Sequence, residues 1–472
     1  MNLLRFFGKA SDDSYSIEHI PESDRYGAAS SLGAIWTVAN VQLGTVITGV
    51  IAVLLGLDIE WAIISVVIGN LIGCVFMAYH SAQGPKLGLP QMIQSRAQFG
   101  VYGAWLPMAA VIVLFVGFFI TGAILTGESL AALLHVTLAE GIWIGSAIAF
   151  VMTYFGYEFI HRYDKFVAAI VSLIFVVITI KLVTVLPSHL PSSSPSWGVV
   201  FLMVSIAATW QLTWAPYVSD YSRYLPVNTS TIQIFWFTYL GSAVAGVWLM
   251  VVGILAGTVG GSALSVDPAG YIGTLFPGAH WLAFIGIAAS LLIIQAMSLY
   301  SGFLTIMSSL FASTKVPNAV NSRIVASLVI GVGGSIAAVA ASGNFITNFT
   351  NFLLFLLYLI VPWTAINLTD FYIVRKGQYS IPDFFKGSGL YGKVNIRTII
   401  IYVIALLVEL PFADSSFYEG PISKHLMGGA DIAWIVGLVV AAGLYLAWVA
   451  PNVRKGMKSD PVAPTSEVGS LD

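Results

Sequence analysis

The chain has 472 residues, of which 58% are hydrophobic and only 9% are charged. A soluble globular protein carries about 25% charged residues, so this composition excludes a soluble fold and predicts a polytopic membrane protein. The net charge of −2, with only 20 Lys and Arg residues, excludes a basic surface for nucleic acid. The single cysteine, Cys74, excludes an intramolecular disulfide and a cysteine metal cluster.

The apolar runs are long enough to cross a bilayer as helices, which takes ~20 residues each. We predict twelve spans, over 28–54, 60–80, 103–127, 140–161, 164–186, 198–219, 230–258, 280–312, 323–341, 344–372, 396–412 and 430–450. With a cytoplasmic N-terminus, 18 of the 20 Lys and Arg residues fall on the cytoplasmic side, and only Lys181 and Lys424 do not. This positive-inside bias predicts that both termini are cytoplasmic.

Polar residues interrupt the first span, in SLGAIWTVANVQLGT (31–45). Asn40 and Gln42 lie at mid-membrane depth, where hydrocarbon offers no hydrogen-bond partner to an amide. Transporter sites often lie where a helix is broken in this way, so both amides are candidate substrate ligands. The alternative is that they join neighbouring helices by hydrogen bonds.

The sixth span carries a second interruption, TWQLTWAPYVSDYSRYLP (209–226). Pro216 lacks a backbone donor, so we expect it to bend or end the helix. Trp210 and Trp214 offer flat stacking faces and Gln211 offers an amide, which makes all three candidate substrate ligands. For the tryptophans the alternative is an interfacial belt position, which the mid-membrane depth of Trp210 disfavours.

One interruption lies in the first span of the set one to five, and the other lies in the first span of the set six to ten. Because five is odd, the second set must be inverted relative to the first, and the site of such a repeat lies between its halves near the midplane. The predicted segments are a cytoplasmic N-terminal segment 1–27, repeats 28–186 and 198–372, two additional helices 396–450, and a disordered cytoplasmic tail 451–472.

The third and eighth spans carry weaker polar signals, in FVGFFITG and IIQAMSLYSG. The candidate substrate contacts there are Phe118, Thr121, Gln295 and Ser298. Ordinary packing is the alternative for the ring, and a bond between helices is the alternative for Gln295. The spacings Gly69/Gly73 and Gly141/Gly145 predict close packing of the second and fourth spans.

Ionisable residues in or near the spans are few, and such residues are functional candidates by default. They are Glu128, Glu158, Asp220, Asp370 and Glu409. Asp220 precedes Arg223 by three residues, which is a helical ion-pair spacing. We interpret Asp220 as a structural clamp or a cytoplasmic gate, and we keep Asp220 and Glu158 as gate or proton-linked candidates.

This chemistry suits a flat, neutral substrate that forms hydrogen bonds. Amide side chains present a donor beside an acceptor, and aromatic stacking supplies affinity without selecting one ring. A charged substrate would require an opposite charge at mid-membrane depth, and these spans offer none.

Four stretches resemble the nucleobase–cation symporter family 1, most closely its purine–cytosine permease branch, over about residues 20–450. They are SLGAIWTVANVQLG, GPKLGLPQMIQSRAQFG (84–100), WAPYVSDYSRYLP and PWTAINLTDFYIVRKGQY (362–379). The resemblance implies the all-α leucine-transporter fold, a five-plus-five inverted repeat with two additional C-terminal helices. It also implies cation-coupled uptake of nucleobases or related rings by alternating access.

The resemblance also carries residue roles onto this chain. The substrate glutamine is Gln42, the stacking aromatics lie near Phe118 and at Trp210 or Trp214, and the polar contacts are Thr121 or Gly122 and Gln295 or Ser298. Sodium-coupled members bind the ion through first-span carbonyls, here near Val38 and Val41, and through eighth-span hydroxyls. Ile293 and Ile294 occupy those eighth-span positions here, and a hard cation needs oxygen ligands. We therefore expect a proton as the coupling ion, with Val38 and Val41 as weak sodium candidates.

The favoured hypothesis is a proton-coupled importer of a purine or pyrimidine base, such as cytosine, adenine or hypoxanthine. We expect it in the cell membrane as a monomer without a cofactor, with its substrate and the lipid bilayer as its partners. A neighbouring hypothesis changes the cargo to hydantoin, allantoin or a vitamin-like ring, coupled to sodium or protons. A channel or an intramembrane enzyme is the remote alternative, because the spans show neither a filter motif nor a catalytic set such as paired aspartates.

Overall fold

The computed structural model describes residues 17–155, 157–188, 194–310 and 319–459. Regular secondary structure in these residues is helical, apart from an isolated bridge between Asp414 and Glu419. Within these described residues, eight helices are long and apolar enough to cross a membrane, or nine if one bent pair is a single span. An all-helical architecture is therefore confirmed for the described part of the chain.

Helices of different lengths overlap the predicted spans. In the first half they are α2 (Ser30–Asn40), α3 (Leu43–Leu54), α4 (Ile59–Ser81), α8 (Trp105–Leu134), α9 (Leu138–Phe155) and α10 (Tyr157–Val185). In the second half they are α11 (Trp197–Leu212), α13 (Thr231–Gly260), α16 (His280–Leu310), α17 (Ala319–Ala341) and α18 (Phe345–Leu368). The C-terminal helices are α19 (Ile396–Glu409), α21 (Ala433–Leu444), the π-helix η6 (Tyr445–Val449) and α22 (Ala450–Ser459).

Short helices connect the long ones. They are η1 (Glu22–Asp24), α5 (Gly84–Leu87), α6 (Gln91–Gln94), α7 (Arg96–Phe99), α12 (Val218–Ser222), α14 (Ala263–Val266), α15 (Pro268–Thr274), η2 (Ser342–Asn344), the π-helix η3 (Thr369–Val374), η4 (Pro382–Phe385), η5 (Leu410–Phe412) and α20 (Pro421–Leu426).

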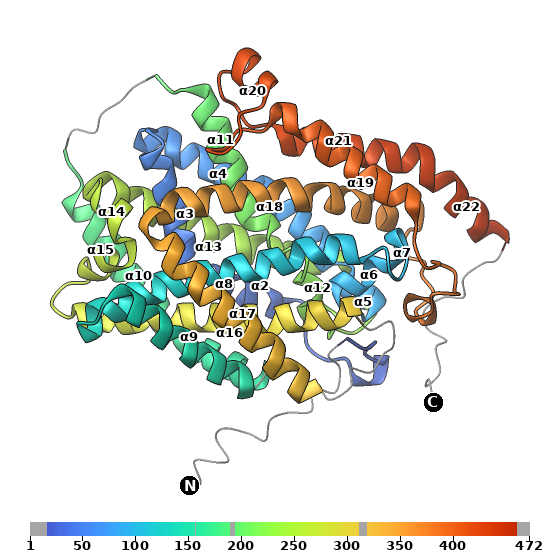
Figure 1. The fold of residues 1–472 in the computed structure, drawn as a ribbon, viewed down its shortest axis with the longest axis horizontal. Coiled ribbons are helices and arrows are strands. Elements are labelled where there is room, and N and C mark those ends of the chain that lie inside the picture. Colours follow the sequence, from blue (N-terminus) through green and yellow to red (C-terminus); the bar gives the residue numbers. More distant parts are fainter. Residues whose placement is uncertain (1–16, 156, 189–193, 311–318, 460–472) are drawn as a thin grey trace, which may run out of the picture.

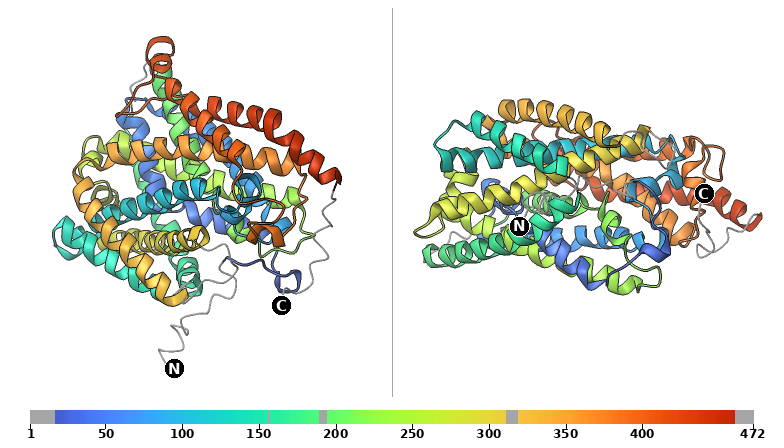
Figure 2. Two further views of the ribbon diagram at one scale, coloured as in Figure 1. Left: turned by 45° about the vertical axis from the view of Figure 1, so that its right-hand side comes forward. Right: turned by 90° about the horizontal axis from the view of Figure 1, so that it is seen from below.

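The long helices form one bundle in which α8 packs against α16, and α4 packs against α11 (Figure 1). The pair α19 and α21 packs against α18 along one edge of this bundle, as the left view of Figure 2 shows. The largest hydrophobic cluster lies among α3, α8, α13 and α16. The C-terminal pair therefore lies outside the helices that surround this core.

The predicted break in the first span is confirmed. Helices α2 and α3 meet at 59° across two residues that are not helical, Val41 and Gln42. The hydroxyl of Thr45 donates to the carbonyl of Asn40 at 2.6 Å, which satisfies an acceptor that the break removes from the helical ladder. The backbone on both sides of the break is buried within the bundle, so the break is sheltered from lipid.

The sixth span is interrupted as Pro216 predicts. Helix α11 ends at Leu212, and α12 begins only at Val218. The residues between them form turns that aim Trp214 and Tyr217 toward the first span. Both predicted interruptions are therefore real features of the chain.

Close glycine contacts explain how the helices approach one another. A side chain at Gly49 of α3 would overlap the Met250 carbonyl of α13, and one at Gly253 of α13 would overlap the Val46 carbonyl of α3. Gly69 and Gly73 lie in the same way against α11, and Gly141 and Gly145 lie against α8. The packing role predicted for both glycine spacings is confirmed.

The tail that we predicted to be disordered from residue 451 begins as a helix instead. Helix α22 extends to Ser459. It continues without a gap from η6, and Pro451 lies two residues after the end of this π-helix. The rest of the predicted tail, 460–472, lies outside the described residues.

Candidate functional site

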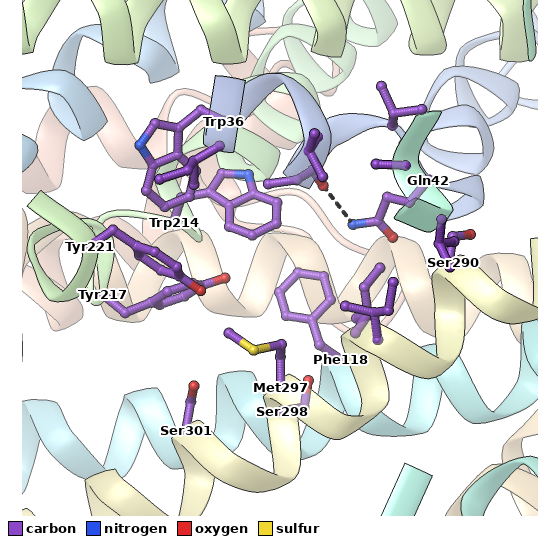
Figure 3. A pocket seen from close by; sticks show the side chains of 18 of the residues that line it. Trp36, Gln42, Phe118, Trp214, Tyr217, Tyr221, Ser290, Met297, Ser298 and Ser301 are labelled. Atoms are coloured by element: carbon purple, nitrogen blue, oxygen red, sulfur yellow. Dashed lines mark hydrogen bonds between the residues drawn. The ribbon is translucent and has the colours of Figure 1, made fainter. Parts of the chain in front are cut away.

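A cavity of about 100 Å³ lies beside the break between α2 and α3. A single water needs roughly 10–15 Å³ measured in this way, so the cavity is large enough for a small organic molecule. Side chains from α2 and the break after it, from α8, α10, α12 and α16, and from the segment between α11 and α12 line it (Figure 3). They are Ile35, Trp36, Val38, Ala39, Val41, Gln42, Phe115, Phe118, Val167, Ala168, Trp214, Tyr217, Tyr221, Ser290, Ile293, Ile294, Met297, Ser298 and Ser301, all of them uncharged types.

Aromatic rings form one wall of the cavity. Trp214 lies edge-to-face against Trp36 and Tyr217, with both ring centroids at 5.7 Å. Phe118 projects between this group and α16 in Figure 3. The resulting wall presents several ring faces to whatever occupies the cavity.

The two tryptophans of the sixth span have different positions, which answers a question that the sequence left open. Trp214 lines the cavity, whereas Trp210 is only 1% exposed and lies outside the lining. Trp210 supports the wall from behind, with its ring edge-to-face against Phe118 at 5.9 Å and against Trp214 at 6.2 Å. The structure therefore places Trp214, rather than Trp210, where a ligand would stack.

Gln42 contributes an amide group to the lining. Because it lies at the break, its backbone is extended and its side chain turns into the cavity (Figure 3). Its amide nitrogen donates to the Ala39 carbonyl at 3.3 Å, which is longer than a good N–H···O bond. A ligand could replace this weak bond at little cost.

Asn40 and Gln211, also predicted to bind substrate, lie outside the lining in a buried network. The side-chain oxygen Oδ1 of Asn40 accepts from Trp210 Nε1 at 2.9 Å and from Gln211 Nε2 at 3.4 Å. Its amide nitrogen donates to the Ser242 hydroxyl at 2.9 Å, and Gln211 Nε2 donates to the Asn70 oxygen at 2.6 Å. This is the alternative that the sequence left open, because these amides join α2, α4, α11 and α13.

The candidates of the third and eighth spans also fall into two groups, those that line the cavity and those that do not. Gln295 is fully buried, and its Nε2 donates to the Thr126 hydroxyl at 2.7 Å and to the Gly122 carbonyl at 3.2 Å, so it joins α16 to α8. Thr121 lies outside the lining of the cavity. Ser298 lines the cavity, and Phe118 does so from α8.

The weak sodium candidates Val38 and Val41 both line the cavity, as do Ile293 and Ile294 of α16. The Val38 carbonyl already accepts from the backbone N–H of Val41 at 3.0 Å. The aliphatic side chains of the two isoleucines supply no oxygen ligand to a hard cation.

Asp220 lies in α12, beyond the end of α11. One of its carboxylate oxygens accepts from the backbone N–H of Gln91 at 2.8 Å, which fixes the segment 84–100 to α12. Burial raises the pKa of Asp220 to about 6, while the charge of Arg223 and the Gln91 N–H act in the opposite direction. Glu158 belongs to α10, but its side chain lies outside the part of the chain that the structure describes.

Sequence reasoning missed four aromatic lining residues. They are Trp36, Phe115, Tyr217 and Tyr221. Trp36 stands one helical turn before Asn40, and the two tyrosines stand one turn apart after Pro216. Helical spacing from the two breaks was therefore a signal that pointed to them.

The chain matches the family model described as "Permease for cytosine/purines, uracil, thiamine, allantoin" over residues 19–437. The YxlA protein of Bacillus subtilis, whose name marks it as a candidate purine-cytosine permease, is 38% identical over 447 residues, 93% of this chain and 96% of that protein. The purine-cytosine permease fcyB of Emericella nidulans is 26% identical over 453 residues, 91% of this chain and 87% of that protein.

Solved structures of Mhp1 have the same fold. Its inward-facing conformation has a TM-score of 0.75 at 17% identity and covers 98% of each chain. Its closed conformation with bromovinylhydantoin, described as a nucleobase-cation-symport-1 family transporter, has a TM-score of 0.73 at 18% identity over 97% of this chain and 98% of that one. These likenesses show the fold, and the family match shows a multi-pass membrane permease rather than an enzyme. The chain belongs to the family of permeases for cytosine/purines, uracil, thiamine and allantoin.

Proposed function

We propose that this permease imports a purine or pyrimidine base, such as cytosine, adenine or hypoxanthine, by proton symport. The cavity beside the α2–α3 break carries the proposal, because its polar and aromatic groups are neutral and suit an uncharged planar ring. The base stacks on Trp214 and Phe118, and the Gln42 amide pairs with a donor and an acceptor on its edge. Ser298 supplies a further hydroxyl.

Alternating access is the transport mechanism that we propose. The chain crosses the cell membrane twelve times with both termini in the cytoplasm, as a five-plus-five inverted repeat with two additional helices, and it works as a monomer. Because the cavity lies where both repeats are interrupted, a rocking of one set of helices against the other exposes it to each side in turn. The break in α2–α3 and the end of α11 support this arrangement.

The proposed coupling ion is a proton rather than sodium. The eighth-helix positions at the cavity carry aliphatic Ile293 and Ile294. Ser290, the hydroxyl nearest to them in sequence, donates to the Ile287 carbonyl of its own helix at 2.9 Å. Both observations disfavour a sodium site built with side-chain oxygens of α16.

A binding screen tests the proposal. Purified protein is titrated with cytosine, adenine, hypoxanthine and uracil, with and without sodium and at two pH values. We expect saturable binding of at least one base that does not change with sodium. Absence of base binding would overturn the substrate class, and a sodium-dependent affinity would overturn the coupling ion alone.

A second cargo is favoured by one specific observation, the hydantoin bound in the related closed structure. The alternative is therefore a carrier of hydantoin, allantoin or a vitamin-like ring in the same cavity. Competition against labelled adenine or cytosine uptake separates the two. Stronger competition by hydantoin or allantoin than by any nucleobase would favour the second cargo.

A further inference from the structure

The buried carboxylates of the described chain differ sharply in their hydrogen bonds. Asp370 accepts from Gln98, Tyr379 and Tyr445 and pairs with Arg375 at 3.1 Å. Glu128 accepts from the backbone N–H of Ala269 at 2.9 Å. Both oxygens of Glu409, by contrast, lack a hydrogen-bond partner among the described residues, although the residue is only 1% exposed.

Packing encloses Glu409 between the two additional helices. It is the last residue of α19, and its carboxyl lies against the backbone of α21 at Gly437, where even a methyl group would overlap it. An unpaired carboxylate in such a place would lose its hydration without any compensating contact. A neutral carboxyl, which holds a proton, is the form that this environment tolerates.

A second buried carboxylate, Asp431, lies two residues before α21, the helix whose Gly437 packs against the Glu409 carboxyl. Asp431 accepts from the backbone N–H groups of Asp414 at 2.9 Å and Ala433 at 3.1 Å, and from the Tyr358 hydroxyl of α18. These donors stabilise a negative charge on Asp431. A second negative charge on Glu409 would repel it in the same enclosed site.

The same residues connect the site to the helices of the cavity. Tyr358 belongs to α18, and the Asp431 carbonyl accepts from the Ser205 hydroxyl of α11 at 2.9 Å. Helix α11 leads to Trp210 and Trp214. A change of charge at Glu409 therefore acts on a contact between the C-terminal pair and the helix that ends at the cavity.

We propose that Glu409, beside Asp431, is the proton-binding carboxyl of the transport cycle. This inference rests on the proton symport proposed above. While the proton is bound, α19 and α21 stay packed against α18 and α11. When these helices separate, water enters and takes up the proton. The loss of the proton then commits the transporter to its next conformation. Other titratable groups near the site are Tyr402 on α19, Tyr358 on α18, and Asp414, Glu419 and Lys424 in the connecting segment.

Infrared spectroscopy tests proton binding without transport. The purified wild-type protein should show a carbonyl stretching band of a protonated carboxylic acid at neutral pH, and Glu409→Gln should lose one such band. Glu419→Gln is the matched control, because Glu419 is exposed and paired with Lys424 at 2.6 Å. A spectrum that Glu409→Gln leaves unchanged would contradict the proposal. Glu409→Leu provides a second neutral variant of similar size.

Transport by reconstituted protein tests the role in coupling. Labelled adenine or cytosine, whichever the binding screen identifies, is followed during accumulation driven by a pH gradient and during exchange without a gradient. We expect Glu409→Gln and Glu409→Leu to exchange the base but to lose accumulation above the equilibrium ratio, while Glu419→Gln behaves as the wild type.

The outcomes separate the two proposals. If the wild type and Glu409→Gln both accumulate the base, Glu409 is not the proton carrier, and proton symport stands. If the wild type does not accumulate the base in response to the pH gradient, proton symport itself is wrong, and the role of Glu409 in coupling falls with it.

Discussion

Two amides of one broken helix have different roles, and the difference lies in the direction of their side chains. Both were predictable from the sequence as polar residues at mid-membrane depth. Asn40 ends α2 and faces α11 and α13, whereas the extended backbone at Gln42 turns its side chain into the cavity. An amide pattern alone does not reveal this, because the local geometry of the break decides which face each residue occupies.

Replacing Trp214 and Trp210 in turn tests the assignment of the stacking residue. Trp214→Ala should abolish base binding with a small change in thermal stability, because the side chain borders a cavity. Trp210→Ala should lower the stability by about 3–5 kcal/mol, since it removes a fully buried ring. Ligand titration and thermal unfolding of the purified variants measure both effects. Unchanged base binding by Trp214→Ala would contradict the assignment.

Replacing Gln42 and Asn40 tests the division between the cavity and the network. Gln42→Ala should weaken base binding by about 1–3 kcal/mol, which is roughly 5- to 150-fold, because a polar edge of the base loses its partner. Asn40→Ala should instead lower the melting temperature, because it leaves the buried Nε1 donor of Trp210 without its acceptor. Equal loss of stability in both variants would argue that Gln42 is structural.

At the scale of elements, long apolar helices were predictable and a buried polar connection was not. The sequence GPKLGLPQMIQSRAQFG has the composition of a surface loop, yet Gln91, Gln94, Arg96 and Gln98 are each at most 1% exposed. It folds as α5, α6 and α7, and partners distant in sequence, such as Asp220 and Asp370, form hydrogen bonds with some of its buried polar groups. Sequence patterns that reflect only local burial do not carry that information.

Gly246 of α13 offers a test of the buried network as a contact between helices. A methyl group there would overlap the Gln211 amide nitrogen and the Asn70 oxygen. Gly246→Ala should therefore destabilise the protein by about 1–3 kcal/mol, as measured by thermal unfolding. Gly333→Ala in α17 is the matched control, because a methyl group there meets open space. The idea fails if both variants unfold at the wild-type temperature.

The contact between α12 and the segment 84–100 should depend on pH. The pKa of Asp220 is raised in the folded state, from 3.8 to about 6. The folded protein therefore binds this proton more tightly than the unfolded chain does, and the contribution of Asp220 to stability falls as the pH rises through this interval. Asp220→Asn should flatten that part of the curve of melting temperature against pH. An unaltered curve of melting temperature against pH would contradict the raised pKa of Asp220.

At the scale of the whole molecule, the charge distribution and the two helix breaks carry more information about the architecture than the helix lengths do. The charge bias predicts an orientation for the entire bundle, because a miscounted span would exchange the sides of all later loops. The described helices leave the number of crossings open, since α11 and α19 have only 16 and 14 residues. The continuous stretch Asn321–Val374 also counts as one candidate span, although two spans are predicted there.

Labelling of single cysteines tests both the orientation and the count. Cys74 is buried, so the parent protein should react little with a membrane-impermeant maleimide. Lys86 is exposed at the predicted cytoplasmic end, and Lys424 is exposed in α20, which is predicted to lie on the opposite side. The third to eleventh predicted spans separate these residues, and their number is odd. Lys424→Cys should therefore react in intact cells, and Lys86→Cys only after the membrane is permeabilised. Reaction of both from one side would contradict the count of spans, and the reverse pattern would invert the orientation.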